Sequence, residues 1–250
     1  ASGDLAGRVE QAGEVDAVVS PMRVRLPEFQ WSGVTHVGGV REHNEDAWFA
    51  SDDVCIVADG MGGHAAGEVA SGLVVQLVSE LFDAHRLDVT ELPAFVSALN
   101  NAVLRRGAEN GTPGMGTTVV GVAIADNGAT PSAVVFHVGD SRCYRLHGGG
   151  LSQITSDHSH VQELVDAGRI TQAEAAEHPL RNGITRARGA EPTVVADFHV
   201  LGEEDCRRLL CSDGLSGEVG DGVIGSVQLG PLGPAASARS SIQTSGMFPR

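Results

Sequence analysis

Apolar residues repeat with helical spacing along two stretches in the first half of the chain. The first stretch predicts an amphipathic helix over residues 67–85. Its apolar face consists of Val69, Leu73, Val74, Leu77, Val78, Leu81 and Phe82. The second stretch predicts a helix that begins after Thr90 as its N-cap, and its apolar stripe consists of Phe95, Val96, Leu99, Ala102 and Val103. Because each helix is apolar on one side only, we expect both to pack on one face of a sheet.

Short runs rich in apolar and β-branched residues predict strands. The runs are residues 53–58, 117–125, 133–139, 143–146, 151–155, 193–201 and 207–211. Asp126-Asn127-Gly128 and His147-Gly148-Gly149-Gly150 separate neighbouring runs and are typical of hairpin turns. Two short helices are predicted over residues 161–167 and 173–178, and Thr171 and Glu174 have capping-box spacing at the second. Hairpins outnumber helical crossovers, so we expect an α+β fold with largely antiparallel sheets.

The two ends of the chain lack these patterns. Residues 1–30 carry Pro21, Pro27 and mixed charges with little periodicity, which indicates an N-terminal tail or linker. Residues 222–250 contain no Asp or Glu and are rich in Gly, Pro, Ala and Ser, which predicts a weakly ordered tail. We therefore expect one domain over residues 31–221.

Composition excludes several classes of protein. A net charge of −15 over 250 residues argues against a nucleic-acid-binding surface, which needs basic residues. No run reaches the roughly 18 apolar residues that span a membrane, and residues 1–14 lack the regions of a signal peptide. We therefore expect a cytoplasmic monomer. The four cysteines, Cys55, Cys143, Cys206 and Cys211, form no CxxC pair, so buried thiols are expected rather than a zinc site or disulfides.

Three apolar runs end in an aspartate, at Asp59-Gly60, Asp140-Ser141 and Asp213-Gly214. A strand delivers its last side chain to the sheet edge, and a following glycine lets the backbone turn so that its carbonyl comes near the same place. Carboxylate and carbonyl oxygens suit hard cations such as Mg²⁺ and Mn²⁺. A single Asp-Gly is more simply a turn, but three aspartates that each follow an apolar run, with Glu45 and Asp46 elsewhere, favour a cation site.

Two further residues have open interpretations. Arg41 lies four positions before Glu45, and its guanidinium could bind phosphate oxygens or form a surface ion pair with Glu42 or Glu45. His64 follows a Gly-Gly pair and could donate a proton or simply open the helix.

The order of several short motifs resembles the metal-dependent Ser/Thr protein phosphatases of type 2C in their bacterial form. The matching segments are Arg41-Glu42-His43-Asn44-Glu45-Asp46, Ala58-Asp59-Gly60-Met61-Gly62-Gly63-His64, Gly114-Met115-Gly116-Thr117-Thr118, Val138-Gly139-Asp140-Ser141-Arg142, Thr155-Ser156-Asp157-His158, His178-Pro179-Leu180-Arg181 and Leu210-Cys211-Ser212-Asp213-Gly214. They cover about residues 32–220 in family order. The fold that this resemblance implies is a four-layer α-β-β-α sandwich of two antiparallel sheets flanked by helices.

The resemblance also implies a metal centre between the sheets. Asp59 would bridge two cations and Gly60 would offer its carbonyl. Glu45 would lie beside one cation through water, and Asp213 would hold the other. Asp140 with Asp213 resembles a third-metal site, and residues 155–189 match a mobile flap near the site. Asn182, in this flap, lies where some relatives place a ligand of the third metal.

The implied activity is hydrolysis of phosphoserine and phosphothreonine in proteins by a water that Mn²⁺ or Mg²⁺ activates. Arg41 would orient the phosphate. Met61 stands where eukaryotic members carry a histidine proposed as general acid, so protonation of the leaving group would fall to water. Phosphorylated Ser/Thr proteins, and a cognate Ser/Thr kinase, are the implied partners.

One departure separates this chain from the family pattern. Members end with a helix and a strand bearing Gly-x-Asp-Asn-x-Thr, whose aspartate is a metal ligand, whereas no Asp-Asn follows Asp213 here. We therefore expect the fold to lack the final helix and strand and the site to lack one ligand, unless Asp46 or Asp221 replaces it. The alternative functions are a catalytically impaired domain that binds phosphoproteins or kinases, and a metal-binding regulatory domain without a phosphate ligand.

Overall fold

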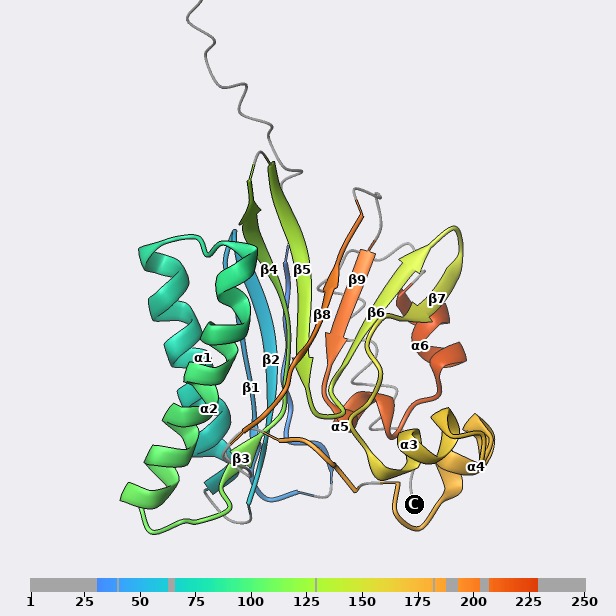
Figure 1. Ribbon diagram of the computed structural model, residues 1–250. Helices are drawn as coiled ribbons and strands as arrows, with labels where there is room; N and C mark the ends of the chain where they lie inside the picture. The colour runs from blue at the N-terminus through green and yellow to red at the C-terminus, as the bar shows by residue number, and fades with distance from the viewer. Residues whose placement is uncertain are drawn as a thin grey trace, which may run out of the picture.

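Two antiparallel sheets lie face to face and carry helices on their outer sides (Figure 1). The computed structural model describes residues 31–39, 41–62, 66–128, 130–181, 183–187, 193–202 and 207–228. Within these residues the layers follow the order helix pair, larger sheet, smaller sheet, helices. The predicted four-layer α+β sandwich is confirmed.

The larger sheet has the strand order β1-β2-β4-β5-β8, and a short strand, β3, pairs with the end of β2. Its strands are β1 (Asp46–Ala50), β2 (Val54–Met61), β3 (Gly116–Thr117), β4 (Val119–Asn127), β5 (Thr130–Val138) and β8 (Asp197–Val200). β4 and β5 form the predicted hairpin, and Gly128 in its turn has a φ of 70°, which glycine adopts without strain. All pairings in this sheet are antiparallel.

The smaller sheet has the order β7-β6-β9. Its strands are β6 (Arg142–His147), β7 (Gly150–Gln153) and β9 (Arg207–Cys211). Arg142, the first residue of β6, pairs with Cys211, the last residue of β9. The turn before β6 and the segment after β9 therefore meet at one edge of this sheet, which brings Asp140 and Asp213 to the same end.

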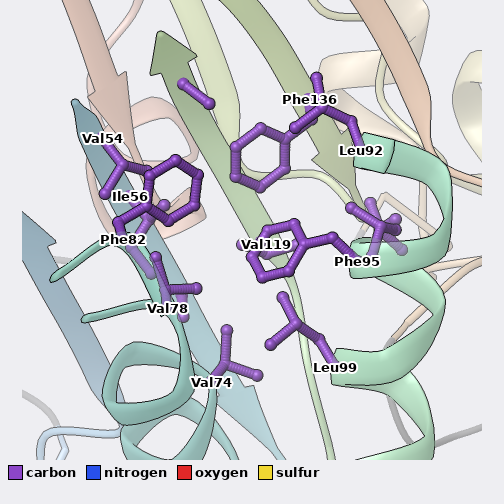
Figure 2. Packing of buried hydrophobic residues seen from close by; sticks show 14 of the residues in the cluster. Val54, Ile56, Val74, Val78, Phe82, Leu92, Phe95, Leu99, Val119 and Phe136 are labelled. Atoms are coloured by element: carbon purple, nitrogen blue, oxygen red, sulfur yellow. The ribbon is translucent and has the colours of Figure 1, made fainter. Parts of the chain in front are cut away.

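A pair of helices covers the outer face of the larger sheet, as the periodicity predicts. These are α1 (Ala66–Ala84) and α2 (Leu92–Glu109), which follows a 3₁₀ turn, η1 (Val89–Glu91). Figure 2 shows the side chains that they share with the sheet. Phe95 meets Phe82 and Phe136 edge to face, with ring centroids 5.8 and 6.2 Å apart. Burying each such side chain contributes about 1.5–3 kcal/mol, so this layer is a major part of the core.

A second apolar layer lies between the sheets. Along β4, Val119 and Ala123 face the helices, whereas Val120 and Val122 belong to the cluster with Cys143 of the smaller sheet. This alternation is the period-2 pattern of a strand that is buried on both faces. It explains why residues 119–125 read as a continuous apolar run.

The remaining helices are short, and two of them precede and two follow β9 in the chain. They are α3 (His160–Asp166), α4 (Gln172–Glu177), α5 (Asp213–Ser216) and α6 (Asp221–Gln228). The predicted capping box at α4 is present, because Thr171 Oγ1 accepts from Glu174 N and Glu174 Oε2 accepts from Thr171 N. No helix among the described residues is long and apolar enough to cross a membrane.

Three local predictions are wrong. Thr90 does not cap α2, because Asp88 accepts from Thr90 N and starts η1, and the chain continues from η1 into Leu92. The strand predicted over 193–201 is shorter, because β8 pairs with β5 only over Asp197–Val200. Regular structure continues past Asp221, because α6 runs to Gln228 and buries Ile224, so a helix stands where an irregular tail is predicted. Residues 1–30 and 229–250 lie outside the described residues.

Candidate active site

Carboxylates from four separate segments converge where strands of both sheets end. The register of β1 and β2 places Asp46 directly opposite Asp59. Asp140 follows β5 and Asp213 follows β9, so all four lie at one end of the sandwich. The strand-end prediction for Asp59, Asp140 and Asp213 therefore corresponds to one cluster, and Asp46 belongs to the same cluster.

The backbone of Asp59 is held by two threonines of the Gly114–Thr118 motif. Thr118 Oγ1 accepts from Asp59 N at 3.1 Å, and Thr118 N donates to Asp59 O at 2.8 Å. Thr117 Oγ1 donates to the same Asp59 carbonyl at 2.8 Å. Both threonines are fully buried. This motif therefore fixes the position of Asp59 rather than supplying a ligand itself.

Glycines allow Glu45 to approach the same place. Gly60 N donates to the Glu45 carbonyl at 3.1 Å, and a Cβ at Gly60 would collide with the backbone of Gly67 in α1. A Cβ at Gly67 would lie only 2.6 Å from Glu45 Oε1. The Glu45 carboxylate therefore lies against the first turn of α1, and the Glu45 backbone lies beside Gly60.

Ser212 links the Asp46 carboxylate to the segment that carries Asp213. Its hydroxyl donates to Asp46 Oδ2 at 2.7 Å, and Ser212 is the N-cap residue of α5, in which Asp213 is the first residue. Ser212 is buried. Sequence reasoning gave this serine no role, although it stands directly between a buried strand and a candidate ligand.

Asp140 is the most enclosed member of the cluster, with only 8% of its surface exposed. Its Oδ1 atom is buried and has no hydrogen-bond partner among the described residues. Such an orphaned carboxylate oxygen is costly unless a ligand completes it. The unpaired Oδ1 atom of Asp140 therefore indicates that the cluster binds a cation.

The charges of the cluster repel one another. Burial, together with the charges of Asp46 and Asp213, raises the pKa of Asp59 to about 9. Burial and the charge of Asp213 raise the pKa of Asp140 to about 7, and burial also raises the pKa of Asp46. Carboxylates that lie close together have raised pKa values when no cation neutralises their charges. The donor set consists of carboxylate oxygens, which fits Mn²⁺ or Mg²⁺.

Arg41 lies just before β1 and is exposed. Among the described residues none forms an ion pair with its guanidinium, so the alternative of an ion pair with Glu42 or Glu45 is not what the structure shows. The guanidinium is thus available for an anionic ligand. Asn182 and His64, the other two candidates, lie outside the described residues.

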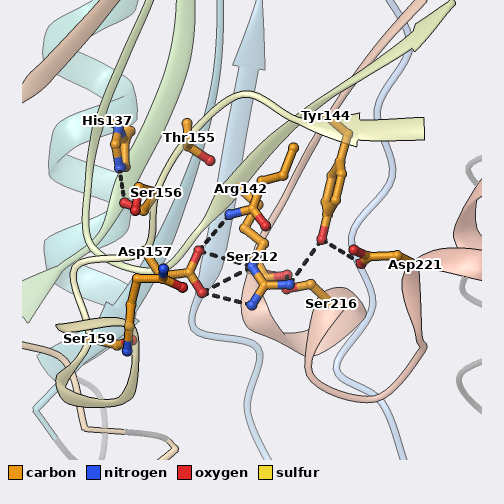
Figure 3. Close-up of polar contacts among 12 residues, drawn as sticks. His137, Arg142, Tyr144, Thr155, Ser156, Asp157, Ser159, Ser212, Ser216 and Asp221 are labelled. Atoms are coloured by element: carbon orange, nitrogen blue, oxygen red, sulfur yellow. Dashed lines mark hydrogen bonds and ion pairs between the residues drawn. The ribbon is translucent and has the colours of Figure 1, made fainter. Parts of the chain in front are cut away.

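Asp221 does not join the cluster. Its Oδ1 accepts a 3.0 Å hydrogen bond from the Tyr144 hydroxyl, which in turn accepts from Arg142 Nη1 at 3.0 Å (Figure 3). Arg142 forms a close ion pair with Asp157 at 2.7 Å. Burial opposes the charge of Arg142, but Asp157 outweighs it and raises the pKa of the guanidinium. The motifs containing Arg142 and Asp157 were visible in the sequence, but their mutual contact was not.

A second polar group lies beside the cluster. Possible ligand atoms of His137, His158 and Asp197 lie within 4.8 Å of one another. His137 Nε2 donates to the Ser156 carbonyl at 2.8 Å (Figure 3), and His158 Nε2 donates to Asp197 Oδ2 at 3.2 Å, whereas His137 Nδ1 has no hydrogen-bond partner among the described residues. Sequence reasoning did not single out this group.

Comparison with known proteins gives a consistent result. The family model of protein phosphatase 2C matches residues 35–227. The serine/threonine protein phosphatase PstP of Mycobacterium tuberculosis is 44% identical over 193 residues, which are 75% of this chain and 36% of PstP. The serine/threonine phosphatase stp of Listeria welshimeri is 39% identical over 198 residues, which are 74% of this chain and 77% of that protein. The chain thus spans about a third of the length of PstP.

Solved structures agree with the architecture. The crystal structure of M. tuberculosis PstP aligns with a TM-score of 0.73 at 42% identity and covers 84% of this chain and 88% of that one. The catalytic domain of PstP in complex with two manganese ions aligns with a TM-score of 0.72 at 39% identity, covering 84% and 87%. A bacterial serine phosphatase aligns with a TM-score of 0.77 at 33% identity, covering 85% and 90%.

Proposed function

This chain belongs to the protein phosphatase 2C family, and we propose that it hydrolyses phosphoserine and phosphothreonine in proteins with the help of divalent cations. The observation that carries the proposal is the convergence of Asp46, Asp59, Asp140 and Asp213 from separate strand ends, with mutual repulsion that a cation would relieve. Relatives named as serine/threonine phosphatases favour hydrolysis over a domain that only binds phosphoproteins.

The ligand assignment follows from position in the cluster. Asp59 is central, because the charges of Asp46, Asp213 and Asp140 all raise its pKa. Asp59 and the Gly60 carbonyl would hold divalent cations, and Asp213 would hold the second one. Glu45, packed against Gly67, would act through water, and Asp140 with Asp213 would hold a third cation. When bound by these carboxylates, Mn²⁺ or Mg²⁺ would neutralise their charge and would supply a water of lowered pKa for attack on phosphorus.

Arg41 completes the proposed site from the outside. An exposed guanidinium without an ion-pair partner among the described residues can take two phosphate oxygens in a bidentate contact. That contact orients phosphorus toward the carboxylate cluster and offsets negative charge in the transition state. The P–O ester bond breaks, the serine or threonine oxygen leaves as a hydroxyl, and inorganic phosphate is the second product. Met61 carries no titratable group, so the proton for the leaving oxygen comes from water.

We propose further that a cognate Ser/Thr kinase phosphorylates the substrates and that the domain acts as a monomer in the cytoplasm.

A turnover assay tests the proposal. Release of phosphate from an aryl phosphate and from a phosphothreonine peptide is measured with and without Mn²⁺, and Asp59→Asn serves as the inactive reference. We expect Mn²⁺-dependent release by the unchanged chain and none by the variant. Phosphopeptide binding without any release would support the non-catalytic alternative instead.

A further inference from the structure

His158 holds the turn that carries Asp140. Its Nδ1 accepts a hydrogen bond from Gly139 N at 3.2 Å, and its own backbone N donates to the Gly139 carbonyl at 2.9 Å. Gly139 has a φ of 108°, and a Cβ there would collide with Thr118 Cγ2 at 2.6 Å. The turn therefore adopts a conformation that needs glycine. His158 holds it through hydrogen bonds to both the N–H and the carbonyl of Gly139.

Asp140 depends on this turn for its direction. Its Oδ1 has no hydrogen-bond partner among the described residues, so no side chain there fixes that oxygen. The neighbouring Ser141 is held instead, because its hydroxyl contacts Thr118 Oγ1 at 2.7 Å. Any shift of Gly139 would therefore move the Asp140 carboxylate relative to Asp213.

The imidazole of His158 is itself fixed. Since Nδ1 accepts from an amide, Nε2 carries the proton and donates to Asp197 Oδ2 at 3.2 Å. Arg186 Nη1 lies 3.5 Å from Asp197 Oδ1 and 3.3 Å from His158 Nε2, so the same carboxylate also pairs with a guanidinium. The ring stacks on fully buried His137, with centroids 4.4 Å apart. With both nitrogens bonded and a guanidinium beside it, His158 is a poor ligand for a metal.

Both ends of the segment 158–185 meet at this residue. Thr185 N donates to the His158 carbonyl at 2.8 Å, and Ser159 forms an antiparallel bridge with Ile184. His160 N donates to the Gly183 carbonyl at 2.9 Å. A displacement of this segment would therefore be transmitted to Gly139 through His158.

We propose that His158 is a positioning residue: it ties the segment 158–185 to the orientation of Asp140, and thereby sets how tightly the cluster holds its weakest cation. This inference rests on the metal centre of the proposed function. It assigns no chemistry to the imidazole, because His158 acts only through the Gly139 turn.

Two substitutions test the two ring nitrogens of His158 one at a time. In His158→Asn the amide oxygen can take the place of Nδ1 and accept from Gly139 N, whereas in His158→Gln the amide nitrogen can take the place of Nε2 and donate to Asp197. Manganese binding is measured by calorimetry on the full chain, with Mn²⁺ alone as the probe. We expect His158→Asn to keep the wild-type isotherm and His158→Gln to weaken the last Mn²⁺ by about 10-fold, the lower end for residues that orient a ligand.

The matched control is His199→Gln. His199 also stacks on His137, at 6.3 Å, but among the described residues it forms no hydrogen bond with the Gly139 turn, so the isotherm of this variant should not change. A purely structural role would make the Asn and Gln variants of His158 lose melting temperature and manganese affinity together. Equal isotherms for these two variants, or no Mn²⁺ binding by the unchanged chain, would overturn the inference.

A further variant covers the case in which His158→Gln does not fold. Asp197 is 42% exposed, so Asp197→Ala releases Nε2 without opening the core, and it should keep the wild-type isotherm as His158→Asn does, because the bond from Gly139 N to Nδ1 remains. A loss of manganese affinity in Asp197→Ala would then decide against the inference. Turnover is measured separately: a split between the Asn and Gln isotherms without phosphate release would count against the proposed hydrolysis only.

Discussion

Ser212 donates a 2.7 Å hydrogen bond to Asp46, a residue 166 positions earlier in the chain. Ser212 follows β9 of the smaller sheet and Asp46 begins β1 of the larger one. This bond therefore joins the two sheets at the end of the sandwich where the carboxylates of the cluster lie. Burial and the negative charges of Asp213 and Glu45 raise the pKa of Asp46, whereas the hydrogen bond from Ser212 lowers it. The two sheets are thus joined at the point where their charges would push them apart.

Ser212→Ala should lower the free energy of unfolding by about 2 kcal/mol, because a buried hydroxyl that donates to a carboxylate is lost. Urea unfolding in EDTA measures this change. The control is Ser226→Ala, whose hydroxyl is exposed and donates only to the nearby Val223 carbonyl. Equal stability of the two variants would mean that the Ser212–Asp46 bond contributes little.

Asp59→Asn should abolish manganese-dependent turnover and, without metal, should stabilise the fold. The reason is that Asp59 receives the repulsion of Asp46, Asp213 and Asp140, and an amide keeps the size of the side chain while removing its charge. Thermal unfolding in EDTA at pH 8 and a phosphate-release assay measure the two effects. Wild-type turnover by this variant at saturating Mn²⁺ would show that the ligand assignment is wrong.

Stability of the metal-free protein should fall as the pH rises from about 5 to 9. Asp59 and Asp140 have pKa values of about 9 and about 7 in the folded state, against 3.8 for an ordinary aspartate. The folded state therefore binds more protons than the unfolded chain in this range, and the slope is at most about 1.4 kcal/mol per pH unit for each proton.

Melting temperatures in EDTA at pH 6, 7, 8 and 9 check this dependence. Asp59→Asn should remove much of the slope, and saturating Mn²⁺ should reverse its sign because cations bind the charged carboxylates. A flat profile for the metal-free wild type would contradict the raised pKa values.

The sequence predicted the helices and strands in which the apolar spacing repeats several times. It did not predict the features that depend on one contact, such as a cap or a short terminal helix. The α1 stripe from Val69 to Phe82 contains enough apolar positions to fix a helix almost to its ends. Thr90 was wrongly predicted as the N-cap of α2, because Asp88, two residues earlier, caps the 3₁₀ turn η1 that precedes this helix. The helix α6 was missed because its two glycines and the lack of charged residues after Asp221 resemble a linker, although Ile224 is buried.

The site divides in the same way. Asp59, Asp140 and Asp213 could be found because each ends an apolar run, which is a local feature. The contacts of Ser212 with Asp46 and of His158 with Gly139 could not, because they join segments whose spatial relation only the folded sheets define. The roles of Arg41 and Glu45 stay predictions, as does the part that Asn182 would take.

Arg41→Ala should raise the KM for a phosphothreonine peptide by about 10-fold or more, since one charge-assisted bidentate contact is lost. Manganese affinity should stay unchanged, because a guanidinium cannot bind a cation. Steady-state kinetics and calorimetry with Mn²⁺ measure the two quantities. Arg105→Ala, an exposed position on α2, is the control. A parallel loss of manganese affinity would place Arg41 in the metal site rather than at the phosphate.

Asp46, and not Asp221, should be the carboxylate that completes the metal centre. Residues 222–250 contain no Asp or Glu, and the two candidates for a further carboxylate ligand are Asp46 and Asp221. Asp46 lies opposite Asp59 in the strand register, whereas Asp221 is occupied by the Tyr144 hydroxyl at 3.0 Å.

The two aspartates should therefore respond differently to the same substitution. Asp46→Asn should weaken Mn²⁺ binding by at least about 10-fold, because a charged ligand of a hard cation becomes neutral. Asp221→Asn should leave the Mn²⁺ isotherm unchanged and lower the melting temperature slightly, because the Tyr144 bond becomes a neutral one. Calorimetry and thermal unfolding on both variants make the comparison. If Asp221→Asn instead loses manganese while Asp46→Asn keeps it, then the first residue of α6 supplies the missing ligand, and the Tyr144 contact must break when the cation binds.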